Sequence, residues 1–176
     1  GIEYKTANFF EIDEALAAFP EDACVVFVGS LGLAKQLQRK SKWIPGVYYA
    51  PKVYECQHYY AYLGNYLFNE NYAFIPFGDL RRRKEFIYEH FGQDRTIFIR
   101  PDRGDKPFVG QMMYKEYFDK DLDRISWGKM KPEELVVVAE PRKIVAEWRF
   151  VVVNGVVITG SEYKRGERVG SVAEYP

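Results

Sequence analysis

The distribution of apolar residues divides the chain into a first half that predicts alternating strands and helices and a second half richer in strands. Residues 23–29 form a short continuous apolar run, which predicts a strand buried on both faces. Helical spacing follows over 33–40, then a second short strand over 46–50 and a helix over 54–68. This order of elements indicates a small α/β layer at the N-terminal end.

The central part of the chain contains both helices and strands. Residues 74–78 contain Pro76 and predict a linker or an edge strand, because proline cannot donate a hydrogen bond within a sheet. A helix is predicted over 79–91, ending at Gly92. The remaining predicted elements are strands over 96–100, 109–113 and 135–139 and a helix over 114–125.

The safest structural prediction is a hairpin near the C-terminal end. Two runs rich in β-branched residues, 144–153 and 156–163, flank the dipeptide Asn154-Gly155. Asn-Gly favours the tight turn in which both central residues have positive φ, and this turn joins antiparallel strands.

The composition limits the classes of function. Of the 176 residues 47% are apolar and 28% charged, as in ordinary soluble domains. No apolar run reaches the roughly 20 residues of a membrane span, and a net charge of zero counts against a dedicated nucleic-acid binder. Cys24 and Cys56 have no zinc-ligand or disulfide-framework spacing. We therefore expect a cytoplasmic protein with no nucleic-acid or membrane partner.

The segment Arg100–Lys106 is a candidate for anion binding. Arg100 closes an apolar strand, Gly104 would let the backbone approach a ligand closely, and Lys106 adds a mobile charge. A flexible charged hairpin loop would have the same composition, so the segment alone leaves both interpretations open.

The strand 146–151 is a second candidate. Alternation places Glu147 and Arg149 on one face, with Trp148 on the other. This pair fits either a site that orients a phosphate or acidic substrate, or an exposed face with a cross-strand ion pair. Lys164, at the end of the second hairpin strand, fits either a phosphate contact or a solvated strand end.

Other site types find little support. The chain has no Walker loop and no Gly-x-Gly-x-x-Gly fingerprint. His58 and His90 lack metal-ligand spacing, so no metal residues are predicted. The run Arg81–Lys84 fits a solvated helix face better than a nucleic-acid contact.

Three segments together resemble a known family. They are residues 100–111, residues 135–142 and residues 146–163. They resemble the ATP-grasp clade named for two arginines and a lysine, whose members are common in bacteria and phages. The resemblance implies a pre-ATP-grasp-like α/β domain over 1–77 and a partial, α+β ATP-grasp lobe with an antiparallel hairpin over 78–176.

The resemblance also implies a chemistry and a set of site residues. ATP lies between two lobes and activates a carboxylate as an acyl phosphate, which an amine then attacks. Arg100 and Lys106 would contact the phosphates. Glu147 and Arg149 would act at the phosphate and substrate end. The hinge against adenine would be formed by Val138, Ala139 and Glu140.

The resemblance leaves the magnesium site outside the chain. The family holds Mg²⁺ with an Asp and a later Glu-x-Asn, and residues 171–176 come before such a motif. We expect one of two proteins. The first is a ligase whose remaining part is supplied elsewhere, for example by a second chain completing the sheet. The second is a non-catalytic, grasp-derived protein, of phage origin in one version, that acts through a protein partner.

Overall fold

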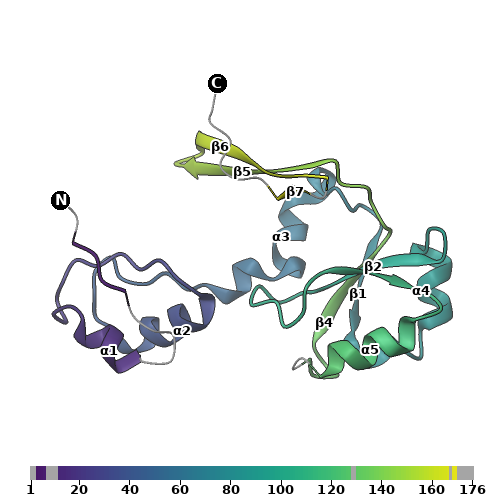
Figure 1. The fold of residues 1–176 in the computed structure, drawn as a ribbon, viewed down its shortest axis with the longest axis horizontal. Coiled ribbons are helices and arrows are strands. Elements are labelled where there is room, and N and C mark those ends of the chain that lie inside the picture. Colours follow the sequence, from purple (N-terminus) through teal and green to yellow (C-terminus); the bar gives the residue numbers. More distant parts are fainter. Residues whose placement is uncertain (1–2, 7–11, 128–129, 167, 170–176) are drawn as a thin grey trace. The chain divides into compact units, whose positions relative to one another are not determined.

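The computed structural model describes residues 3–6, 12–127, 130–166 and, as backbone, 168–169. The chain divides into two compact units, residues 1–140 and 141–176 (Figure 1). The division predicted at residues 77 and 78 stays a prediction about family domains.

A four-stranded antiparallel sheet forms the centre of the first unit. Its order is β1-β4-β2-β3, so β1 and β3 are the edge strands. Pro76 ends β1, in agreement with the edge strand expected from its missing donor. The strands are β1 (Tyr72–Pro76), β2 (Thr96–Pro101), β3 (Gln111–Tyr114) and β4 (Leu135–Ala139).

Strand β4 is buried on both faces of this sheet. Val136 and Val138 pack into one hydrophobic cluster, while Val137 and Ala139 pack into another. Both faces of a central strand therefore need apolar side chains, which explains why its sequence is continuously apolar rather than alternating.

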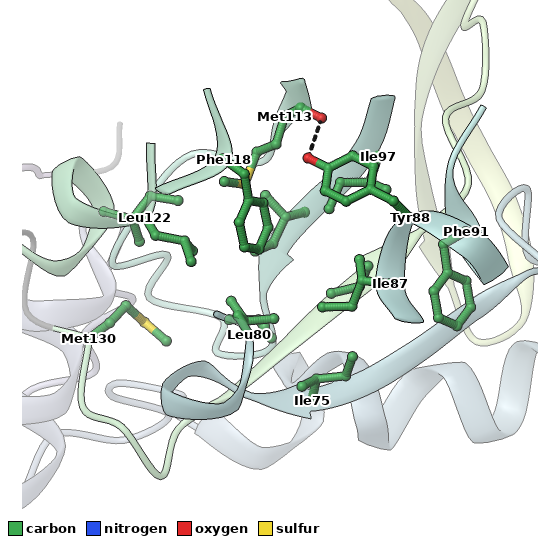
Figure 2. Close-up of a cluster of buried hydrophobic side chains, with 14 residues drawn as sticks. Ile75, Leu80, Ile87, Tyr88, Phe91, Ile97, Met113, Phe118, Leu122 and Met130 are labelled. Carbon is green, nitrogen blue, oxygen red and sulfur yellow. Dashed lines mark hydrogen bonds between the residues drawn. The ribbon is translucent and has the colours of Figure 1, made fainter. Parts of the chain in front are cut away.

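Helices α4 (Lys84–Phe91) and α5 (Phe118–Ser126) supply side chains to the core on one face of the sheet (Figure 2). Within it the Tyr88 hydroxyl donates a hydrogen bond to the Met113 carbonyl at 3.0 Å. Both helices begin later than the sequence predicts. Before α4 lie a short 3₁₀ helix, η3 (Phe77–Asp79), and a turn, in place of a continuous helix from residue 79.

Helix α3 (Cys56–Leu63) packs against the opposite face. Gly64, at φ 47°, ends α3 and separates it from the 3₁₀ helix η2 (Gly64–Tyr66), so the helix predicted over 54–68 is broken. A further 3₁₀ helix, η1 (Pro51–Tyr54), precedes α3. This face carries several aromatic side chains, among them Tyr60 and Phe98.

The N-terminal region contains α1 (Ile12–Ala17) and α2 (Leu31–Lys40), and the Ser30 hydroxyl accepts the Leu33 N–H at the start of α2. The strands predicted over 23–29 and 46–50 are wrong: one parallel bridge joins Val26 to Gly46. Val28 is 92% exposed, because this extended segment packs on the small core with one face and no sheet covers the other. The mixed class of helices and antiparallel sheets is confirmed for the described chain.

The second unit is the predicted hairpin. Strands β5 (Ala146–Val153) and β6 (Val156–Arg165) pair around Asn154 and Gly155, at φ 50° and 78°. Both positive values fit the turn expected for Asn-Gly. The short strand β7 (Arg168–Val169) pairs with β6.

Candidate functional site

Arg100 lies near the end of β2 on the face that α3 covers. Alternation along β2 sends Ile97 and Ile99 into the core of Figure 2 and turns Phe98 and Arg100 the other way. The Arg100 side chain is half-buried. Its charge interacts with the thiol of Cys56 and the phenols of Tyr59 and Tyr60.

The electrostatics keep Arg100 charged without neutralising it. Burial acts to lower the pKa of Arg100, but Cys56, Tyr59 and Tyr60, the last also through a hydrogen bond, prevail and raise it. Burial likewise raises the pKa of Cys56 and of both tyrosines, so these groups stay neutral at physiological pH. No carboxylate among the described residues forms an ion pair with Arg100. A half-buried guanidinium without an ion-pair partner has charge available for an anion.

Asp102, two residues further, has a structural task. Its buried carboxylate accepts the backbone N–H of Gln57 at 2.8 Å, and its carbonyl accepts the N–H of Cys56 at 2.9 Å. These are unpaired donors in the first turn of α3, and Glu55, which precedes the helix, makes no side-chain cap. Asp102 therefore fastens the strand end to the helix beside Arg100.

The loop after Asp102 is held by its own ion pairs. Arg103 pairs with Asp105 and Glu134. A Cβ added to Gly104 would lie 2.3 Å from the Cβ of Tyr54, so this glycine admits Tyr54 rather than a ligand, contrary to the expectation. Lys106 is exposed, with φ 48°, and makes no ion pair within the part of the chain that is described.

On the hairpin, the four polar residues form two different contacts. Glu147 and Lys164 are an ion pair, with Oε1 and Nζ 3.7 Å apart. The guanidinium of Arg149 lies 3.7 Å from the ring centroid of Tyr163. A β-bulge opposite the Glu147–Trp148 step makes Tyr163 the extra residue of β6, which accounts for its position over Arg149.

The two alternatives for this strand therefore apply to different residues. Glu147 takes part in the cross-strand ion pair, and Lys164 is its partner rather than a solvated strand end. Arg149 stacks on an aromatic ring and, among the residues described, pairs with no carboxylate. A stacked guanidinium keeps its donors at the edge of the plane, where they can bind an anion.

The predicted hinge residues occupy the end of β4. Val138 and Ala139 are fully buried and pair with β1 on one side and β2 on the other. Glu140 is half-buried and its N–H donates to the Asn71 carbonyl at 3.1 Å. The boundary between the two compact units falls directly after Glu140. A ligand at this point would meet Glu140, because the side chains of the other two are inside the sheet.

The remaining candidates have structural explanations. Arg81 and Lys84 pair with carboxylates of α5, and Arg82 and Arg83 pair with Asp79, as a solvated ion-pair network requires. The ring of His58 packs on Tyr62, and His90 Nδ1 donates to the Phe86 carbonyl at 2.9 Å.

The described side chains do not form a metal centre. Within the described ranges, no group of three or more His, Cys, Asp or Glu side chains is placed to hold a metal ion. These residues therefore do not themselves fit the Mg²⁺ that the family uses. None of the described helices combines the length and apolar character needed to cross a membrane.

The sequence interpretation missed the surroundings of Arg100. Cys56, Tyr59 and Tyr60 are spaced three and four apart, so a helix presents them on one side. Pairing that side with the Phe98–Arg100 face of β2 would have required knowing that α3 crosses the sheet there. Spacing alone gave no sign of it.

The comparison with known families agrees with this arrangement. The ATP-grasp domain of the clade named for two arginines and a lysine, in its second family, matches residues 79–175. This match is more than half of the chain and includes Arg100, Lys106 and the whole hairpin. No curated protein and no solved structure was found to match. The chain therefore belongs to the ATP-grasp family, in the second family of that clade.

Proposed function

We propose that this chain binds ATP and forms the nucleotide-binding part of an ATP-dependent carboxylate–amine ligase. The observation that carries the proposal is the half-buried Arg100, which keeps its charge but has no ion-pair partner among the described side chains. The position of Arg100 inside the segment matched by an ATP-grasp family supports a nucleotide phosphate as its partner.

In this proposal the other residues have distinct roles. Lys106 adds a second, mobile charge at the phosphates, where its exposure leaves it able to move. The backbone around Glu140 contacts adenine, next to Val138 and Ala139. Arg149 binds the transferring phosphoryl group, while Glu147 and Lys164 hold each other and the strand end in place.

The reaction consists of two balanced displacements. A carboxylate oxygen of the acid attacks the γ-phosphorus of ATP, the bond to the bridging oxygen breaks, and ADP leaves. The amine nitrogen then attacks the acyl carbon and releases phosphate, giving an amide after loss of a proton. The transferring group carries dispersed negative charge, so fixed arginines that face it lower the barrier. Since the described residues do not fit a magnesium site, no step is assigned to one.

Isothermal titration with ATP in buffer containing magnesium tests the proposal. The wild type should bind, and Lys106→Ala and Arg149→Ala should each weaken binding roughly tenfold, as expected for losing a charge-assisted hydrogen bond. Arg82→Ala is the matched control, because its guanidinium is already paired with Asp79. Absence of binding at millimolar ATP, or equal weakening by the control, would contradict the proposal.

A second candidate function, a non-catalytic protein that acts through a partner, is supported by the hairpin. Its apolar side chains are largely exposed, including Trp148, Phe150 and Ile158. Exposed apolar surface of this extent is typical of binding surfaces. Measuring ADP and phosphate release with mixtures of amino acids separates the two: turnover supports the ligase, whereas ATP binding without turnover under these conditions supports the second candidate.

A further inference from the structure

A cleft of about 320 Å³ lies in the first unit beside the Arg103–Asp105 loop. One wall is a stripe of α2 made by Leu31, Lys35 and Arg39, which are four residues apart and so share one side of the helix. Its other lining residues are Tyr49, Pro51, Tyr54, Glu55, Arg103, Gly104 and Asp105.

The wall opposite α2 is held together by specific contacts. Tyr54 packs so closely on Gly104 that no other residue would fit there. The Cys56 N–H donates to the Asp102 carbonyl at 2.9 Å, joining the start of α3 to the loop. Arg103, through Asp105 and Glu134, fixes the rest of the loop. This wall is therefore pre-formed, as small-molecule sites usually are.

The orientation of α2 is set by its other side. Leu33, Ala34 and Leu37 are buried in the N-terminal core together with Trp43. With these residues inward, the Leu31 stripe faces the cleft and carries Lys35 and Arg39 into its lining.

The charges of the cleft are unevenly used. Arg103 and Asp105 neutralise each other, and Glu55 accepts a hydrogen bond from the Gln57 side chain at 3.2 Å. Lys35 and Arg39 form no ion pair with any side chain in the described ranges, although Lys40 on the same helix pairs with Asp13. Two unused cations one helical turn apart, beside tyrosine rings, are suited to an anion attached to an apolar group.

We propose that this cleft binds the carboxylate of a small organic acid, with Lys35 and Arg39 holding the carboxylate and Tyr54 contacting the apolar part. As the site of the acid to be activated, it deepens the proposed ligase function and rests on it. The lining loop continues directly into Lys106, the residue proposed to contact the ATP phosphates, which suits a reaction between carboxylate and γ-phosphate.

Titrations with hippurate, a carboxylate joined to an aromatic ring, and with glutarate test the proposal in the absence of nucleotide. Hippuramide, the neutral counterpart of hippurate, is the ligand control. The wild type should bind at least one of the two acids and bind hippuramide at least tenfold more weakly. The double variant Lys35→Gln/Arg39→Gln should weaken binding of that acid roughly tenfold or more.

Lys40→Gln is the matched control, since it removes one charge from the same helix outside the cleft. The proposal is overturned if neither acid binds at millimolar concentration, if hippuramide binds as well as hippurate, or if Lys40→Gln has the same effect as the double variant. ATP titrations of the same variants keep the two proposals apart. Acid binding without ATP binding would refute the ligase function and leave the cleft, and the reverse result would refute the cleft alone.

Discussion

The central sheet of the first unit and the hairpin of the second are both antiparallel and rich in valine, yet they bury these residues very differently. In β4 the residues Val136–Val138 are fully buried because helices cover both faces of the sheet. In the hairpin Val151–Val153 are each at least half exposed. A two-stranded hairpin is marginally stable by itself in water. β-branched sequence therefore specifies strands in both regions, but only the covered sheet provides a core.

This difference separates stability from binding. The first unit contains the packed core and holds Arg100 at a rigid strand end. The hairpin presents Arg149 on a strand pair whose order depends on its turn and cross-strand contacts. Substitutions that probe the core should unfold the first unit, whereas substitutions in the hairpin should leave its stability nearly unchanged.

The largest expected effect compares two phenylalanines. Phe118 is fully buried beneath the sheet, whereas Phe150 on the hairpin is 61% exposed. Phe118→Ala should lower the free energy of unfolding by about 3–5 kcal/mol, because it leaves a cavity in the core. Phe150→Ala should cost less than about 1 kcal/mol. Urea denaturation followed by tyrosine and tryptophan fluorescence measures both, and equal losses would remove the contrast between the two regions.

The next effect concerns the Asp102 cap of α3. Asp102→Ala should cost about 1–2 kcal/mol, since the first-turn donors lose a buried acceptor. Asp102→Asn keeps an acceptor oxygen, so at neutral pH it should cost clearly less. Urea denaturation measures both variants. A cost for the asparagine variant equal to that of the alanine variant would show that the carboxylate charge, and not the hydrogen bond, matters.

The same carboxyl gives a pH prediction. Burial raises the pKa of Asp102 above its ordinary value, so the folded protein holds this proton more tightly than the unfolded chain. Its contribution to stability is full below about pH 4, near the ordinary aspartate pKa, and is lost as the pH rises through the higher folded-state pKa. Thermal melts of wild type and Asp102→Asn across this range should differ in slope in that direction; parallel curves would contradict the assignment.

A smaller effect is expected from one hydroxyl. Tyr88→Phe removes the hydrogen bond to the Met113 carbonyl that is drawn in Figure 2 and leaves that carbonyl buried. The free energy of unfolding should fall by about 1 kcal/mol. Chemical denaturation measures it, with Tyr114→Phe as a matched control, because the side chain of Tyr114 is exposed. An equal loss in the control would contradict the role of this hydrogen bond.

The smallest effect on the first unit should come from the turn of the hairpin. Gly155 has φ 78°, and Gly155→Ala strains this turn because an alanine Cβ is disfavoured at positive φ. Amide exchange should accelerate in β5 and β6, while the unfolding free energy of the first unit changes by less than about 0.5 kcal/mol. Loss of protection throughout the sheet of the first unit would show that the units are not independent.

Local signals predicted much of this fold and only part of the candidate site. Asn154-Gly155 specified the hairpin, and the apolar run of β4 specified a central strand, because both depend on nearby residues. The run at 23–29 looked alike but found no sheet to join, since the presence of neighbouring strands is not encoded locally. The Asp102 cap joins residues 45 apart in sequence, and Gly104 is required by Tyr54. Such contacts depend on the path of the chain in three dimensions.

Hydrogen–deuterium exchange with and without ATP most directly tests the central claim that Arg100 with its loop and Arg149 with its strand bind the nucleotide. The account predicts slower exchange, on adding ATP, for amides in 102–106 and in the Glu147–Arg149 part of β5, and no change in helix α4. Unchanged exchange in both segments at saturating ATP, or protection confined to α4, would contradict it.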